Sequence, residues 1–208
     1  MDLHRSSNTP DWEAIKPSKR TTIQNVAAST HGIITPPNII SVIGLALVIY
    51  GVIALTQENF WVGFAALVVG RVLDIVDGLV AQATGTKSAL GEFVDASIDK
   101  VGTLLTIVAL FIVAPEYWWL ITALLIPQII IPFVSFYKKQ KKKAVHPTRQ
   151  GKLGMASLWV AIAGLIAVKA FDVEMTHPLA IATLFIAAVS TLLTLYALWQ
   201  YSTGRDSK

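Results

Sequence analysis

Four aspartates lie close together in an otherwise apolar part of this 208-residue chain: Asp74, Asp77, Asp95 and Asp99. The first two are three residues apart and the last two are four apart, so on two helices each pair would point from a single face. A carboxylate cluster, in a chain without Cys and with no His nearby, suits hard cations such as Mg²⁺ or Mn²⁺. Two such ions could hold a pyrophosphate and neutralise the charge of a phosphoryl transfer, while a carboxylate takes a proton from an attacking hydroxyl.

The elements that must position these aspartates are long apolar segments. Hydrophobic residues make up 54% of the chain and charged residues 14%, which excludes a disordered chain and argues against an ordinary soluble domain. Backbone polar groups must be paired inside lipid, so we expect helices of about 20 residues each. Six segments can be marked: Ile39–Leu55, Phe60–Ala83, Phe93–Ala114, Trp118–Phe136, Leu153–Val168 and Pro178–Trp199. The predicted fold class is therefore all-α, a polytopic membrane protein with six transmembrane helices.

Lysine and arginine are distributed unevenly over the connections. Of the 17 basic residues, 14 lie in the two tails and in the second-to-third and fourth-to-fifth connections, whereas Lys169 alone lies in the remaining loops. The positive-inside rule then places both termini, and the nearby aspartates, on the cytoplasmic side. The same rule explains the net charge of +4, so we expect no nucleic-acid partner. For a prokaryotic source the location would be the cell (inner) membrane.

Three parts of the chain are expected from this pattern. Residues 1–35 form a cytoplasmic tail, either an interfacial helix anchored by Trp12 and Ile15 or a loose segment. Residues 36–201 form the six-helix membrane domain, and residues 202–208 form a cytoplasmic C-terminal tail.

The aspartates belong to a longer pattern, and through it the chain resembles the membrane CDP-alcohol phosphotransferase family. That family carries D-x2-D-G-x2-A-R-x8-G-x3-D-x3-D. The chain matches seven of the eight fixed positions, with every spacing intact: Asp74, Asp77, Gly78, Ala81, Gly91, Asp95 and Asp99. The eighth position, the family's arginine, is Gln82 here.

The resemblance implies a reaction and a set of roles. An acceptor alcohol would attack the phosphorus of a CDP-linked donor, CDP-diacylglycerol or another CDP-alcohol, and CMP would leave. Two Mg²⁺ ions, with Mn²⁺ as the alternative, would be held by the four aspartates, and Asp99 would be the general base. The positions expected to bind the donor are Asn38, Ser41, Gly78, Gln82, Ser88 and Gly91. A homodimer is expected, with membrane lipids around it.

Three further basic residues could neutralise the negative charge of the aspartates or of a bound phosphate. Arg71 precedes Asp74 by less than a turn and could balance the charge of the aspartates. Arg149 and Lys152, just before the fifth segment, are candidates for binding a small polar acceptor that carries a phosphate. Gln82 offers hydrogen bonds where an arginine would grip phosphate with two parallel bonds and a fixed charge.

Other classes of protein also carry buried carboxylates. An ion-coupled transporter uses them as relays, but it more often has inverted repeats and more helices. A prenyltransferase binds pyrophosphate through aspartates, but its two motifs usually lie far apart in sequence. A catalytically weakened relative, with a binding or scaffolding role, is supported by Gln82 alone.

Overall fold

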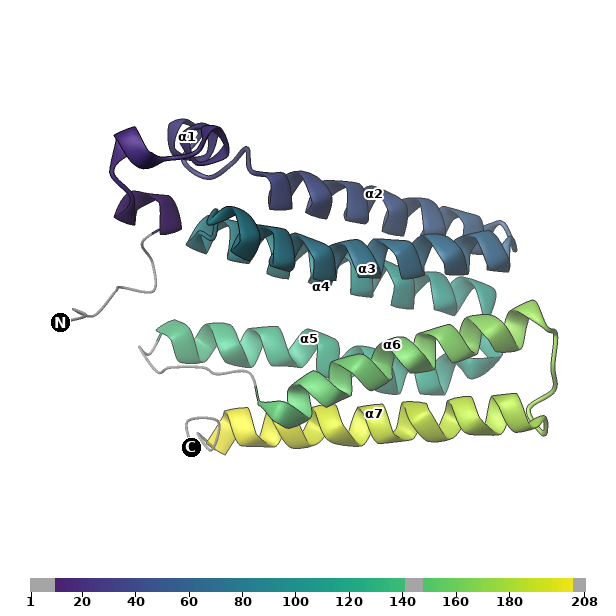
Figure 1. Ribbon diagram of the computed structural model, residues 1–208. Coiled ribbons are helices and arrows are strands. Elements are labelled where there is room, and N and C mark those ends of the chain that lie inside the picture. The colour runs from purple at the N-terminus through teal and green to yellow at the C-terminus, as the bar shows by residue number, and fades with distance from the viewer. Residues whose placement is uncertain (1–9, 141–147, 204–208) are drawn as a thin grey trace. The chain divides into compact units, whose positions relative to one another are not determined.

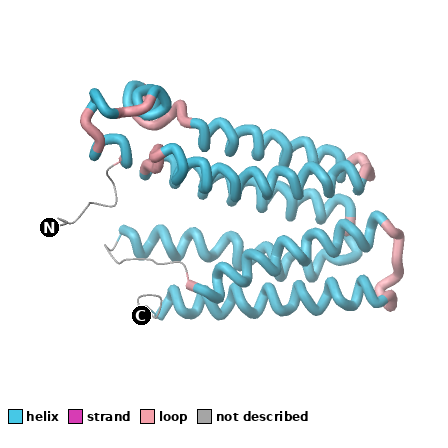
Figure 2. The backbone as a smooth tube through the Cα atoms, in the orientation of Figure 1, coloured by secondary structure: helices cyan, strands magenta, loops and turns pink. Residues whose placement is uncertain are grey.

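The computed structural model describes residues 10–140 and 148–203, and every regular element in these ranges is a helix or a 3₁₀ turn (Figure 2). Short elements come first: η1 (Asp11–Ala14), η2 (Pro17–Lys19) and α1 (Thr22–Ser29). The long helices are α2 (Pro36–Thr56), α3 (Phe60–Thr84), α4 (Ala89–Val113), α5 (Trp118–Gln140), α6 (Arg149–Ala170) and α7 (Pro178–Thr203), with η3 (Pro115–Tyr117) before α5. The remaining parts of the expected tails and of the fourth-to-fifth connection lie outside the described residues.

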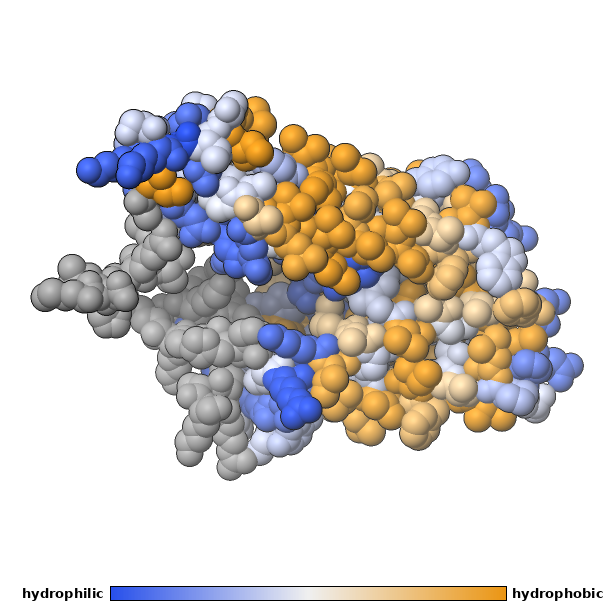
Figure 3. Space-filling model, in the orientation of Figure 1, coloured by the Kyte–Doolittle hydropathy of each residue, from blue (hydrophilic) through white to orange (hydrophobic). Residues whose placement is uncertain are grey.

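The structure confirms the predicted all-α fold with helices that are able to span a membrane. In the part of the chain that the structure describes, five stretches are long and apolar enough to cross a bilayer: α2, α4, Pro115–Val134, α6 and α7. The helix α3 is as long as α4, but Arg71, Asp74 and Asp77 make it too charged to be counted with them. Large apolar side chains stay exposed along α2, where Figure 3 shows them in orange, as expected of a surface that meets lipid.

The chain divides into two compact units, one of residues 1–54 and 65–105 and one of residues 55–64 and 106–208. In the first unit α2 packs on α3 through two glycines (Figure 1). A Cβ atom on Gly70 would lie only 3.0 Å from the carbonyl oxygen of Gly44 and 3.0 Å from Val48 Cγ2. Val48 also faces Gly102 of α4, where a Cβ would lie 3.4 Å from its Cγ1. Small residues thus bring the backbones of α2 and α3 close together and let the Val48 side chain pack against Gly102 of α4.

The N-terminal segment is ordered in a way that the sequence did not show. The helix α1 begins with a capping box, in which Thr21 and Gln24 each bond the other's backbone N–H. Trp12, one of the two residues that could anchor an interfacial helix, is 3% exposed. An aromatic side chain gains from burial in lipid or in protein, and the sequence pattern does not distinguish the two.

The second unit contains α5, α6 and α7, with α7 in contact with both other helices (Figure 1). Gly154 and Gly164 of α6 face Thr194 and Thr183 of α7. The Ser190 hydroxyl donates to the carbonyl oxygen of Gly154 at 3.0 Å, so a polar bond crosses this tight interface. Close packing of small residues with a few hydrogen bonds is the usual way that helices associate in membranes.

Candidate active site

The turn between α3 and α4 brings the aspartate pairs together. Gly85, with φ +63°, follows the last residue of α3, and α4 begins four residues later. A left-handed backbone there suits glycine and lets the chain reverse within a few residues. As a result Asp74, Asp77 and Asp95 each place a carboxylate oxygen within 4.8 Å of the other two. The predicted convergence of the two helices therefore occurs for three of the four aspartates.

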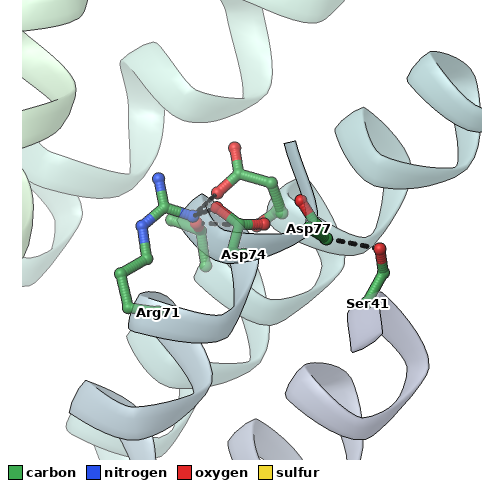
Figure 4. Close-up of polar contacts among 6 residues, drawn as sticks. Ser41, Arg71, Asp74 and Asp77 are labelled. Carbon is green, nitrogen blue, oxygen red and sulfur yellow. Dashed lines mark hydrogen bonds and ion pairs between the residues drawn. The ribbon is translucent and has the colours of Figure 1, made fainter. Parts of the chain in front are cut away.

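Asp77 is the most enclosed of these carboxylates, with 2% of its surface exposed. It accepts a hydrogen bond from the hydroxyl of Ser41 on α2, with the two oxygens 2.5 Å apart (Figure 4). Ser41 is itself 3% exposed. A third helix thus contributes to the aspartate cluster and orients one of its carboxylates.

The fourth aspartate is connected through Arg71. One guanidinium nitrogen of Arg71, Nη1, donates to Asp74 Oδ2 at 2.7 Å and also to Asp99 Oδ1 (Figure 4). Asp99 therefore lies in the same polar network without belonging to the group of three converging oxygens. The expectation that Arg71 balances the charge of the aspartates is confirmed.

The cluster has the features of a divalent cation site. Oxygen Oδ1 of Asp95 is buried and has no hydrogen-bond partner among residues 10–140 and 148–203. Buried carboxylate oxygens are normally paired, and an unpaired one is costly. A set of carboxylate oxygens at this spacing suits Mg²⁺ or Mn²⁺. Asp74, Asp77 and Asp95 consequently fit a divalent cation, and the unpaired oxygen of Asp95 agrees with one.

A cavity of about 190 Å³ opens beside the cluster, between the start of α2 and the α3–α4 turn. All six residues expected to bind the donor line it: Asn38, Ser41, Gly78, Gln82, Ser88 and Gly91. Asp77 and Asp95 contribute to its wall as well. The lining residues that the motif did not single out include Thr86, Lys87 and Glu92, which lie in or just after the turn. Among the described lining residues Lys87 is the one cation.

The polar groups of the cavity are held in place by local bonds. The Asn38 amide nitrogen donates to the carbonyl oxygens of Gly32 and Ile33, both at 3.0 Å. Ser88 Oγ accepts from the N–H of Gly91 at 3.0 Å. Gly78 differs, because a Cβ there would meet nothing within 4 Å. Packing does not require glycine at that position, so the space above it is open to a ligand.

The two acceptor candidates lie in the first turn of α6 and are exposed. This helix is capped by Thr148, whose hydroxyl accepts from the N–H of Gly151 at 3.1 Å. Arg149 and Lys152 belong to the second unit, whereas the cavity lies within the first. Their role toward an acceptor stays a prediction.

Apolar helices, an oxygen-only acidic cluster and an adjoining polar cavity define a class, an integral membrane protein whose acidic cluster fits a divalent cation. The sequence gives the family. The CDP-alcohol phosphatidyltransferase family model matches residues 34–200, and the chain belongs to this family.

Three relatives can be compared with the chain by sequence identity. The chain is 29% identical over 132 residues to the archaetidylinositol phosphate synthase of Aeropyrum pernix, covering 64% of each chain. It is 26% identical to the phosphatidylinositol phosphate synthase of Cutibacterium acnes over 75% of this chain and 81% of that one. It is 32% identical to a putative cardiolipin synthase of Mycobacterium bovis over 45% of each chain. The chain thus spans less than two thirds of the length of the Aeropyrum pernix and Mycobacterium bovis relatives, and no solved structure matches. The names of the family and of these relatives are those of enzymes that transfer phosphate-containing groups in phospholipid biosynthesis.

Proposed function

We propose that this protein transfers a phosphatidyl group from CDP-diacylglycerol to an acceptor alcohol and releases CMP, with Mg²⁺ as cofactor. The observation that carries the proposal is the convergence of Asp74, Asp77 and Asp95 beside a cavity lined by every donor-binding candidate. Membership of the CDP-alcohol phosphatidyltransferase family supports the same chemistry.

The divalent cations would be held by Asp74, Asp77 and Asp95, together with Asp99. When bound, they would neutralise the pyrophosphate of the donor and the charge that develops during transfer. The unpaired oxygen of Asp95 supports this assignment, because it has no other partner among the described residues. Ser41 contributes from outside the set of ligands by orienting the Asp77 carboxylate.

The chemical step is a substitution at phosphorus. The acceptor oxygen forms a bond to the phosphorus that carries diacylglycerol, the bond from that phosphorus to the bridging oxygen breaks, and CMP leaves with the bridging oxygen. The hydroxyl proton passes to the Asp99 carboxylate, acting as general base. Arg71 holds this carboxylate by the hydrogen bond to Oδ1, so that its orientation is defined before the acceptor binds.

The cavity residues would bind the cytidine nucleotide. Asn38 and Ser88 offer polar groups fixed by backbone contacts, and Gly78 leaves room for close approach. Gln82 would contribute hydrogen bonds to the donor. Lys87 supplies the positive charge that the lining otherwise lacks among the described residues, and so favours a phosphate-bearing ligand.

The acceptor is proposed to be a small polar alcohol that carries a phosphate. Two relatives are named as synthases of inositol phosphate lipids, which agrees with such an acceptor. Arg149 and Lys152, exposed at the start of α6, are the residues proposed to contact it. We further propose six membrane spans with α3 as the sixth, both termini and the active site on the cytoplasmic side, and a homodimer.

A direct assay tests this function. The purified protein would be given CDP-diacylglycerol and a panel of acceptors, with Mg²⁺ or with EDTA, and CMP and lipid products measured by mass spectrometry. We expect CMP release that needs both Mg²⁺ and an acceptor, and that is lost in Asp95→Asn. The matched control is Asp172→Asn, an exposed aspartate in the α6–α7 loop that should keep full activity. Absence of CMP release from every donor and acceptor pair would instead favour the non-catalytic relative, and substrate flux into proteoliposomes without CMP would favour a transporter.

A further inference from the structure

The first described residues lie outside the family match and yet contact the cavity wall. The match begins at residue 34, whereas residues 10–33, which we name the N-terminal cap, include η1, η2 and α1. The backbone N–H of Asp11 donates to the carbonyl oxygen of Lys87 at 3.0 Å. The Gln24 amide donates to the carbonyl oxygen of Thr84 at 3.1 Å. Figure 1 shows the cap at the same end of the first unit as the α3–α4 turn.

Trp12 is the centre of the contact between the cap and the cavity. The indole is 3% exposed. A Cβ placed on Gly32 would lie 3.0 Å from Trp12 Cη2 and 3.3 Å from Ser88 Oγ, so both side chains lie close to the same glycine. Gly32 has φ +81°, a conformation that favours glycine. Its carbonyl oxygen also accepts the hydrogen bond from the Asn38 amide.

The contacts of the cap therefore reach three lining residues, two of them through Gly32. Trp12 meets Ser88 across Gly32, Gly32 holds Asn38, and Asp11 holds the backbone of Lys87. None of these routes passes through the aspartate cluster. The cap is thus placed to affect the shape of the nucleotide cavity and not the metal ligands.

A simple role as a membrane anchor does not account for this arrangement. The helix α1 has two different faces. Ile23 and Val26 are 42% and 41% exposed and are free to meet lipid, whereas Gln24 and Ala27 are 8% and 0% exposed and face inward. Lipid contact explains the outer face, but it does not explain why Trp12 and Gln24 are buried.

We infer that the N-terminal cap positions the donor-binding wall, with Trp12 as a positioning residue that holds Gly32, Ser88 and Asn38 in place. The inference rests on the proposed function, since it takes the cavity to be the site of the CDP moiety. Its consequence is specific. Loss of the indole should weaken donor binding while leaving the metal site and the acceptor site as they are.

The test compares Trp12→Ala and Trp12→Phe with the wild type in the full-length protein. The KM for CDP-diacylglycerol, the KM for the acceptor and the affinity for Mn²⁺ would be measured for each. We expect Trp12→Ala to raise the donor KM about tenfold or more, the size of loss that a displaced positioning contact causes. The acceptor KM and the Mn²⁺ affinity should stay unchanged, and Trp12→Phe should recover most of the donor affinity. Trp118→Ala, which removes an indole that is 62% exposed in the second unit, is the matched control.

The outcomes separate this inference from the proposed function. An unchanged donor KM in Trp12→Ala, or a parallel loss of Mn²⁺ affinity that marks general loosening, would overturn the inference while the proposed function stands. If Trp12→Ala does not fold, Trp12→Phe decides, because a smaller rise confined to the donor KM is still expected. A wild-type protein that releases no CMP would overturn the proposed function and this inference with it.

Discussion

The hydroxyl of Ser41 on α2 donates a hydrogen bond to the buried carboxylate of Asp77 on α3. This bond links two helices at the level of the aspartate cluster, and both side chains are almost fully enclosed. Partners of this kind fix the direction of a metal-ligating carboxylate. The helix α2 thus has two roles, since it lines the cavity and also orients a carboxylate of the aspartate cluster.

Ser41→Ala should weaken metal binding without unfolding the protein. The substitution leaves the Asp77 carboxylate without its hydroxyl donor, and loss of such an outer partner typically costs about 10- to 100-fold in metal affinity or activity. The measurement is the Mg²⁺ concentration needed for half-maximal CMP release. Ser97→Ala, which removes a hydroxyl bonded to its own helix, is the control. An unaltered Mg²⁺ requirement in Ser41→Ala would contradict the prediction.

Arg71→Gln should make the stability of the protein depend more strongly on Mg²⁺. Without the guanidinium, Asp74 and Asp99 lose the positive charge that pairs them, so their repulsion is relieved only by bound cation. The melting temperature in detergent should therefore rise more on addition of Mg²⁺ than it does for the wild type. Lys169→Gln, which breaks the 2.9 Å ion pair with Glu116 in the second unit, should show the wild-type response. Equal responses in all three proteins would count against the role given to Arg71.

Gly78→Ala and Gly70→Ala should separate function from packing. A Cβ on Gly78 meets open space, so the variant should melt like the wild type but bind the donor less well. A Cβ on Gly70 meets the backbone of α2, and overpacking of this kind typically costs about 1–3 kcal/mol of stability. Thermal melting and donor KM, measured on both variants, check the prediction. A donor KM unaffected in Gly78→Ala would argue that no ligand approaches that glycine.

Gln82→Arg should strengthen donor binding. Gln82 is exposed and lines the cavity, and an arginine there could pair with a phosphate through two parallel bonds. We expect the donor KM to fall, by about tenfold if one charge-assisted bond of roughly 1.5 kcal/mol is gained. A titration of CDP-diacylglycerol measures this directly. If donor affinity does not improve, Gln82 gives no reason to regard the chain as a weakened relative.

Much of the aspartate cluster in the first unit could be predicted from sequence spacing, because motif residues that are three or four apart share one face of an α-helix. Asp74 and Asp77 had to share a face of α3, and the short turn had to bring them toward Asp95. The bond of Arg71 to Asp99 was harder to foresee, since it depends on the register of α3 against α4 and not on spacing within either helix. The Ser41–Asp77 bond depends in the same way on how closely two glycines let α2 approach α3.

The burial of Trp12 shows a different limit. Hydropathy separates apolar from polar residues, but it does not separate the inside of a protein from the lipid around it. The Trp12 indole lies beside Gly32, which follows α1 in the sequence and has a left-handed backbone. The periodicity of apolar residues in the sequence did not indicate that Trp12 is buried in the protein.

Asp74, Asp77 and Asp95 are proposed to bind a divalent cation together, and the proposed activity depends on this site. The most direct measurement is electron paramagnetic resonance of Mn²⁺ titrated into the purified protein, with Asp95→Asn and Asp172→Asn alongside. We predict saturable Mn²⁺ binding that Mg²⁺ displaces, that Asp95→Asn abolishes or severely weakens, and that Asp172→Asn retains. Equal Mn²⁺ binding by the wild type and Asp95→Asn, or none by the wild type, would contradict this prediction.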